Sequence, residues 1–155
     1  MANTDEKIHV VMFPWLAFGH VTPWLELAKL LAAKGHKISF ISTPTIIDRL
    51  PKPPSNLSST LHFVKLPLPQ VEGLPPDAEA TIDLPANKVQ YLKIALDKLQ
   101  EPFAKVLESL DPRLDLLRFC SILGRADCGS SGHQKCILLY MHCSDGGLSW
   151  SAIVP

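Results

Sequence analysis

The chain has 155 residues, and its 15 Lys and Arg balance its 15 Asp and Glu, so the formal net charge is zero. This length suits one domain with a modest core. The balanced charge lacks the basic excess typical of proteins that bind nucleic acid or anionic membranes. The polar start, Met1 to Lys7, has no apolar segment like that of a signal peptide, and no apolar run is long enough to span a bilayer. We therefore expect a cytoplasmic protein with neither nucleic-acid nor membrane partners.

The first half of the chain alternates predicted strands and helices. His9 to Phe13 is a short apolar, β-branched run that predicts a buried strand. After a loop, Thr22-Pro23 has the pattern of an N-cap followed by proline at the first helical position. Gly35 is the expected residue just beyond the end of this helix. Lys37 to Ser42 predicts the second strand.

The next elements continue this alternation. Thr43-Pro44 predicts a short helix through Leu50, and Leu61 to Leu66 predicts a third strand. Pro67 to Pro85 forms a long loop rich in proline and acidic residues, and loops of this length are often functional. Apolar residues then recur at helical spacing at Leu92, Ala95, Leu96, Leu99, Phe103, Val106, Leu107 and Leu110. Pro102 should divide this stretch into two helices. The order of elements predicts an α/β domain with a parallel sheet, one half of a doubly wound fold.

The composition changes at Arg113. Residues 1–112 hold three glycines and no cysteine, whereas residues 113–155 hold five glycines and all four cysteines, Cys120, Cys128, Cys136 and Cys143. The cysteine spacings lack the close pairs of zinc sites, and a disulfide framework is unusual in the cytosol. We therefore expect no metal site, and we divide the chain into an α/β domain over 1–112 and a tail over 113–155.

One histidine stands where catalytic residues often lie in such folds. His20 follows Gly19 after the first strand, and no G-x-G-x-x-G pattern of dinucleotide-binding proteins is present. The positive end of a helix favours a neutral imidazole, which can accept a proton from a hydroxyl. Spacing alone favours an ordinary loop histidine over a catalytic base, because a lone histidine is a weak signal.

A longer string changes that balance. FPWLAFGHVTPWLELAKLLAAKGHKISFISTP resembles the start of plant family-1 UDP-glycosyltransferases, and the resemblance extends over residues 7–112. Further matches are Asp48 to Pro51, Phe63 to Pro69, Leu74-Pro75, Ala78 to Thr81, Asp83 to Pro85 and Tyr91 to Lys93. The sequence is most similar to the rhamnosyltransferase-like clade that adds a sugar to flavonoid or terpenoid glycosides.

The resemblance implies the N-terminal, Rossmann-like half of the two-domain GT-B fold. It implies that His20 is the general base, which deprotonates an acceptor hydroxyl that attacks a UDP-sugar with inversion. UDP-sugar is then the donor substrate, a small molecule is the acceptor, no cofactor is needed, and a monomer is expected. By the same resemblance Trp15, Phe18, Gly19 and Glu79 line the acceptor pocket, although plain core packing is an equal alternative for Trp15 and Phe18.

The tail departs from this family in a way that suggests a frameshift. In a reading frame shifted by one base, each new codon consists of the last two bases of one codon and the first base of the next. In that frame Arg113 to Gly124 can be read as D-W-I-Y-Y-D-F-A-P-Y-W-A. That is how the family continues, and the agreement extends through Trp150. We infer a one-base shift just before Arg113; a genuinely divergent tail is the alternative.

The frameshift has direct consequences for structure and activity. Arg118 takes the position of the aspartate that orients the histidine in the family, and a cation there cannot accept the imidazole N–H. Asp115 is displaced by three residues and points to the other face of a strand. We expect a poorly structured tail, an unpaired edge on the first strand, and no donor-binding half, so the chain should be inactive by itself. The alternatives are a non-catalytic protein that binds small molecules or partners, and an unstable product without a role.

Overall fold

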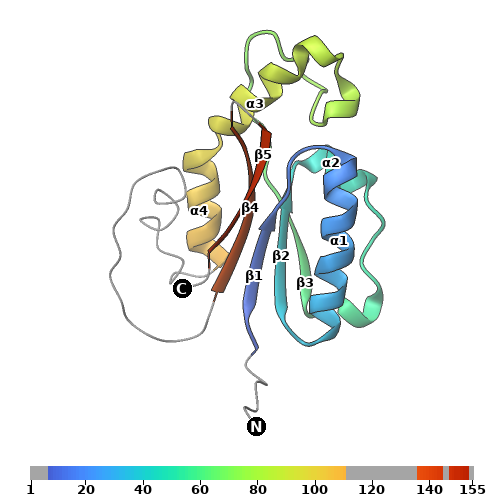
Figure 1. Ribbon diagram of the computed structural model, residues 1–155. Helices are drawn as coiled ribbons and strands as arrows, with labels where there is room; N and C mark the ends of the chain where they lie inside the picture. The colour runs from blue at the N-terminus through green and yellow to red at the C-terminus, as the bar shows by residue number, and fades with distance from the viewer. Residues whose placement is uncertain (1–6, 111–135, 145–146, 154–155) are drawn as a thin grey trace, which may run out of the picture.

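The computed structural model describes residues 7–110, 136–144 and 147–153, which form an α/β domain around one sheet (Figure 1). The strands are β1 (His9–Phe13), β2 (Lys37–Ser42), β3 (Leu61–Lys65), β4 (Cys136–Ser144) and β5 (Gly147–Ile153). Their order in the sheet is β3-β2-β1-β4-β5. The first four strands run parallel, and β5 pairs antiparallel with β4. The predicted parallel α/β architecture is confirmed.

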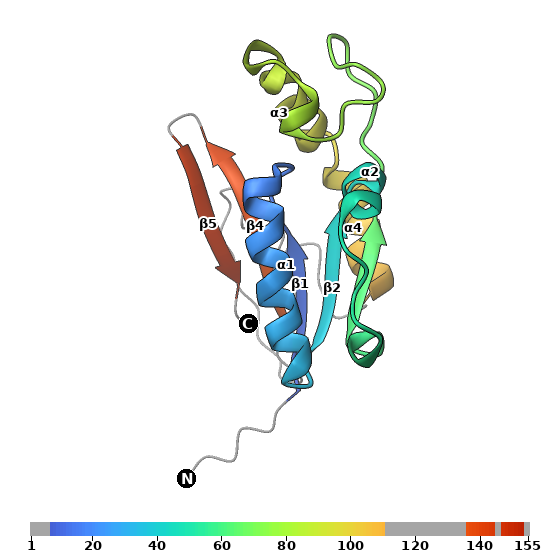
Figure 2. The ribbon, with the colours of Figure 1, turned by 90° about the vertical axis from the view of Figure 1, so that its right-hand side faces the viewer.

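Helices cover both faces of the sheet. Helix α1 (Phe18–Ala33) lies on one face and α4 (Gln100–Leu110) on the other (Figures 1 and 2). All five residues of β1 are buried, as an inner strand of a parallel sheet requires. On the α4 side the rings of Phe13 and Phe103 stack with their centroids 4.9 Å apart. These contacts place the core on both sides of β1 and β2.

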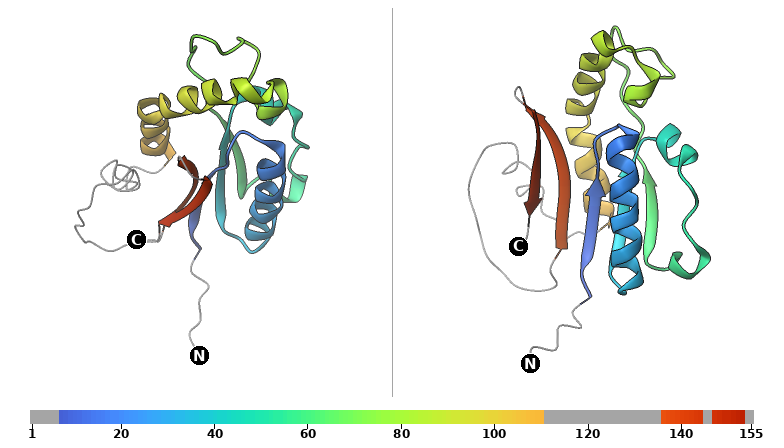
Figure 3. Two further views of the ribbon diagram at one scale, coloured as in Figure 1. Left: turned by 45° about the horizontal axis from the view of Figure 1, so that its top comes forward. Right: turned by 45° about the vertical axis from the view of Figure 1, so that its right-hand side comes forward.

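The shorter elements gather at the carboxyl ends of the parallel strands. Helix α2 (Pro44–Arg49) follows β2 directly, and α3 (Val89–Asp97) lies across this end of the sheet (Figure 3). The described residues also form three 3-10 turns: η1 (Ser55–Leu57), η2 (Thr81–Asp83) and η3 (Ala86–Lys88). The predicted division of the last helical stretch is confirmed, although the break falls at 98–99 and Pro102 lies inside the first turn of α4.

Helix α1 begins one turn earlier than the sequence predicts. Ala17 holds the N-cap position, and its carbonyl accepts the N–H groups of His20 at 2.8 Å and Val21 at 2.9 Å. Pro23, expected at the first position, lies inside the helix. Its missing N–H removes the bond to the Gly19 carbonyl, and the preceding turn is held by the Ala17 bonds instead. His20 is therefore a residue of the first helical turn rather than of the loop.

The end of α1 agrees with the prediction. Gly35 has a φ of +88°, which is the left-handed conformation that glycine adopts without steric cost. Its N–H donates to the carbonyl of Ala32 at 2.9 Å, and the N–H of His36 donates to the carbonyl of Leu31 at 3.2 Å. This pair of bonds is the Schellman arrangement that ends helices, and it turns the chain into β2.

The edge of β1 is not left unpaired, which corrects the sequence expectation. β4 pairs with β1 in parallel, from His9 opposite Cys136 to Phe13 opposite Tyr140. A fully apolar strand leaves N–H and C=O groups that need a partner, and the apolar run from Cys136 to Met141 supplies one. Two strands thus lie within the segment for which the sequence predicted poor structure. Arg118, Asp115 and the boundary at residue 112 fall outside the described residues.

Candidate functional site

The sheet order marks one position where ligands bind in open α/β folds. From β1 the chain proceeds outward to β2 and β3, whereas β4 lies on the opposite side of β1. Such a reversal creates a crevice outside the carboxyl ends of the two strands that flank it. The loop that leaves β1 and the first turn of α1 border this position (Figure 2). The candidate site is therefore at the carboxyl ends of β1 and β4.

His20 lies at this position. It is the third residue of α1, so it sits among the N–H groups at the positive end of the helix. Its side chain is half-buried, and the Nδ1 atom is buried with no hydrogen-bond partner in the described part of the chain. Buried ring nitrogens are seldom left without a partner. A ring nitrogen without a partner beside this reversal in strand order can receive an orienting hydrogen-bonding group.

The other residues predicted near His20 have different environments. Trp15 is only 5% exposed and belongs to the core, which favours the packing alternative for this side chain. Phe18 is half-buried and packs against the same core. Gly19 is exposed, and a Cβ added there would meet no atom within 4 Å. Of these three residues, Gly19 and Phe18 have surface that a ligand can reach, whereas Trp15 is buried in the core.

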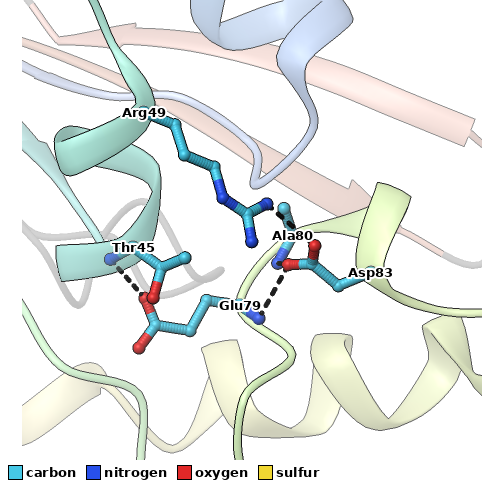
Figure 4. A network of polar contacts seen from close by, with 5 residues as sticks. All are labelled: Thr45, Arg49, Glu79, Ala80 and Asp83. Carbon is cyan, nitrogen blue, oxygen red and sulfur yellow. Dashed lines mark hydrogen bonds and ion pairs between the residues drawn. The ribbon is translucent and has the colours of Figure 1, made fainter.

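Glu79 takes part in a polar network that the sequence did not reveal (Figure 4). Its carboxylate accepts the backbone N–H of Thr45 at 2.7 Å, in the first turn of α2. The carboxylate of Asp83 accepts from Arg49 at 2.8 Å, and it also accepts the N–H groups of Ala80 at 3.0 Å and Glu79 at 3.3 Å. The network connects the long loop to α2. Glu79, which the sequence predicts at the acceptor pocket, uses one carboxylate oxygen for this connection.

Two hydroxyls at the carboxyl end of β2 share the unusual state of His20. Ser42 and Thr43 are fully buried, and neither hydroxyl has a hydrogen-bond partner among the residues described. Thr43 holds the N-cap position of α2 without making a side-chain capping bond. Three unpartnered polar atoms of the described residues thus lie at the carboxyl ends of β1 and β2, next to the position between β1 and β4 that the sheet topology marks.

The described residues contain no helix that combines the length and apolar character needed to cross a membrane. Nor does that part of the chain bring three or more His, Cys, Asp or Glu side chains together in a group able to hold a metal ion.

Comparison with known proteins places the chain in a family. Residues 6–115 match the family described as glycosyltransferase, N-terminal domain. The chain is 57% identical over 108 residues to UDP-glycosyltransferase 91C1 of Arabidopsis thaliana, covering 70% of this chain and 24% of the relative. It is 45% identical over 119 residues to soyasaponin III rhamnosyltransferase of Glycine max, covering 77% and 25% respectively. The chain therefore spans about a quarter of the length of these relatives.

Solved structures agree with this assignment. Arabidopsis thaliana UGT89C1 complexed with UDP-L-rhamnose aligns with a TM-score of 0.58 and 25% sequence identity, over 68% of this chain and 28% of that one. The same protein complexed with quercetin aligns with a TM-score of 0.57 over 66% and 26%. The chain belongs to the plant UDP-glycosyltransferase family, whose members take the sugar from a UDP-sugar, and it corresponds to the N-terminal part of their GT-B fold.

Proposed function

We propose that this chain is the acceptor-side module of a UDP-sugar-dependent glycosyltransferase, with His20 as the general base. In this reaction the imidazole takes the proton of an acceptor hydroxyl while that oxygen attacks the anomeric carbon of the UDP-sugar. The bond from that carbon to the UDP oxygen breaks on the opposite face, so the configuration inverts and UDP leaves. A positioned base of this kind contributes on the order of a hundredfold to ten-thousandfold in rate.

The observation that carries the proposal is the position of the His20 ring. It lies in the first turn of the helix after β1, beside the reversal in sheet order, and its Nδ1 is buried without a partner in the described part of the chain. A core histidine normally has its ring nitrogens satisfied, as His9 does through the hydroxyl of Ser39 at 2.9 Å. The Nδ1 atom of His20 has no such hydrogen-bond partner in the described part of the chain, and it lies where the sheet topology favours a ligand.

The relatives suggest the class of acceptor. Names among them include soyasaponin III rhamnosyltransferase and the anthocyanidin-3-O-glucoside rhamnosyltransferase of Petunia hybrida, which is 41% identical over 119 residues. The structure of UGT89C1 with quercetin shows a relative binding a flat polyphenol. We propose a flavonoid or terpenoid glycoside as acceptor, with Phe18 and Gly19 bordering its place. A monomer in the cytoplasm completes the proposal, and sedimentation and cell fractionation test those two points.

We further propose that the 155 residues alone bind an acceptor without transferring sugar. The matched segment is 24% of the length of UDP-glycosyltransferase 91C1. Transfer requires donor and acceptor to be held together, and that positioning supplies several kcal/mol of the barrier reduction.

Two experiments test the proposal. Titration of the 155-residue chain with an anthocyanidin 3-O-glucoside should show saturable binding, and incubation with this glucoside and UDP-rhamnose should give no rhamnosylated product. In a full-length protein made by restoring the reading frame before Arg113, His20→Ala should lower turnover about a hundredfold or more at saturating acceptor. The control is His62→Ala, because His62 is exposed on β3. Near-normal turnover of His20→Ala would show that this residue is not the base.

A further inference from the structure

A single carboxylate joins α2 to the loop in front of the candidate site. Asp83 accepts a hydrogen bond from Arg49 Nη1 through Oδ1 at 2.8 Å, and through Oδ2 it accepts the N–H groups of Ala80 at 3.0 Å and Glu79 at 3.3 Å (Figure 4). One side chain thus organises the backbone of its own turn and fastens that turn to the last residue of α2. We name residues 79–83 the clamp segment.

The clamp segment has a second attachment at the other end of the same helix. Glu79 Oε2 accepts the N–H of Thr45 at 2.7 Å, so the two carboxylates reach the first turn and the last residue of α2. Attachment at two separate points fixes both the position and the orientation of a short segment. Ala80, which lies between the two carboxylates, is fully buried. The clamp segment is therefore a rigid part of the domain, although it belongs to a long loop.

Hydrogen bonds continue from the clamp segment to the turn that holds His20. The N–H of Thr81 donates to the carbonyl of Leu16 at 2.9 Å. Leu16 is fully buried in the loop after β1, and the next residue, Ala17, accepts the backbone N–H of His20 at 2.8 Å. A continuous path of short contacts thus runs from Arg49 through Asp83 and Thr81 to the first turn of α1.

We propose that Asp83 is a positioning residue for His20, acting through Thr81 and Leu16. The inference rests on the proposed role of His20 as the base. The ring Nδ1 has no partner of its own within the described residues, so its placement relies on the backbone that carries it. The ion pair contributes little to stability, because the Arg49 side chain is 42% exposed and the Asp83 side chain 18%. Its contribution is geometric, since reacting groups must be placed to within about an ångström.

The experiment compares Asp83→Ala with the matched control Asp48→Ala in the 155-residue chain. Asp48 also lies on α2 and also forms an ion pair, with Lys65 at 2.5 Å, but that pair is exposed and faces β3 rather than the loop. Two readouts are measured: amide hydrogen exchange at Thr81, and the tautomer ratio of the His20 ring from its nitrogen NMR shifts. Exchange at Met12, on β1, reports whether the sheet is intact.

Asp83→Ala should raise exchange at Thr81 by about tenfold or more and change the His20 tautomer ratio, while Met12 and the Asp48→Ala protein stay unchanged. Unaltered amide exchange at Thr81 and an unaltered His20 tautomer ratio in Asp83→Ala, or equal changes of both in Asp48→Ala, would overturn the proposal.

If Asp83→Ala does not fold, Arg49→Met tests the same point, because it keeps the Asp83 carboxylate and its bonds to the backbone. It should produce a smaller change in the same direction, and no change would again overturn the proposal. These readouts do not depend on sugar transfer, so they separate this inference from the role of His20 in catalysis.

Discussion

The carboxylate of Glu79 caps the helix that begins beside Thr43. Its Oε2 accepts the N–H of Thr45 at 2.7 Å from a position 34 residues further along the chain. Thr43 holds the N-cap position, where a threonine hydroxyl ordinarily accepts such a bond. Here that hydroxyl is fully buried and has no partner in the described part of the chain. A long-range carboxylate has taken the place of the local cap.

The first prediction is that Thr43 compensates for the loss of Glu79. Glu79→Ala should lower the free energy of unfolding by only about 0.5 kcal/mol, because the Thr43 hydroxyl can then accept the freed N–H. Thr43→Val should be neutral or slightly stabilising, since it removes a buried hydroxyl without a partner. The double variant should cost about 1 kcal/mol more than the sum of the single variants. Urea unfolding of the four proteins measures this coupling.

A matched control exists on the same loop. Glu72 is exposed, so Glu72→Ala should change stability little and should not couple to Thr43→Val. Strict additivity of Glu79→Ala and Thr43→Val would show that the hydroxyl does not replace the carboxylate.

The second prediction contrasts two serines of β2. Ser39 and Ser42 are both fully buried, but of the two hydroxyls only that of Ser39 has a hydrogen-bond partner within the described residues, the Nε2 of His9 at 2.9 Å. Ser39→Ala should lower the free energy of unfolding by about 1–2 kcal/mol, because it leaves a buried ring nitrogen without this hydrogen bond. Ser42→Ala should be neutral or stabilising. Urea unfolding of the two variants measures this difference. An equal loss in the free energy of unfolding for both would mean that the contact with His9 does not contribute to stability.

The strands were the part of the fold that the sequence predicted best. β1 and β2 have the predicted bounds, because each is an apolar, β-branched run that ends at a proline or begins just after a glycine turn. The start of α1 was missed because Thr22-Pro23 has the composition of a helix start, whereas the helix actually begins at Phe18. At Ala17 no side chain makes a capping bond, so no residue type there signals the boundary. β4 was missed because its segment follows a stretch without periodicity, and its pairing with β1 is a contact distant in sequence.

The third prediction concerns the glycine that allows the long loop to approach α3. Gly73 has a φ of +88°, and a Cβ built on it would lie 2.8 Å from the ring of Tyr91. Gly73→Ala should therefore lower the free energy of unfolding by about 1–2 kcal/mol, from the left-handed backbone and the steric contact together. Thermal or urea unfolding measures the change.

Two variants dissect that result. In a Tyr91→Ala background the steric part should disappear, so Gly73→Ala should cost less there. Gly19→Ala serves as the contrasting glycine, because it lies in α1 with open space around its Cβ. It should stabilise the protein by about 0.5 kcal/mol through helix propensity. A neutral Gly73→Ala would contradict the close approach between the loop and α3.

The candidate site was predictable only in part, and for a physical reason. His20 could be singled out because it follows a strand and stands at the positive end of a helix, both of which are local features. The partners of Glu79 and Asp83 lie 34 residues away in sequence. A carboxylate in a polar loop has the same local pattern whether it faces a ligand or a helix end, so Asp83, Arg49 and Thr45 carried no signal of their own. The resemblance to the family puts Glu79 beside the acceptor pocket, which stays a prediction, and it did not indicate the contact of Glu79 with Thr45.

The last prediction tests the frameshift through the edge of β1. In the present chain Cys136 to Tyr140 pair with β1. If one base is restored before Arg113, every later codon is read in the new frame, so the sequence that now forms β4 (Cys136–Ser144) is replaced. The new sequence that begins at position 113 should then pair with this edge, because it follows α4 directly and carries the family's strand pattern. The same correction should place an aspartate at the position of Arg118. We expect that carboxylate to bond the ring of His20, whose Nδ1 has no partner among the described residues. Sequencing of the transcript around the codons for Asp111 to Arg113 should show the open frame, and cross-strand NMR contacts to Val11 should shift to the restored segment.

If the corrected frame instead reaches a stop codon within a few codons, the tail is not frameshifted glycosyltransferase sequence, and the family pattern ends where the composition changes.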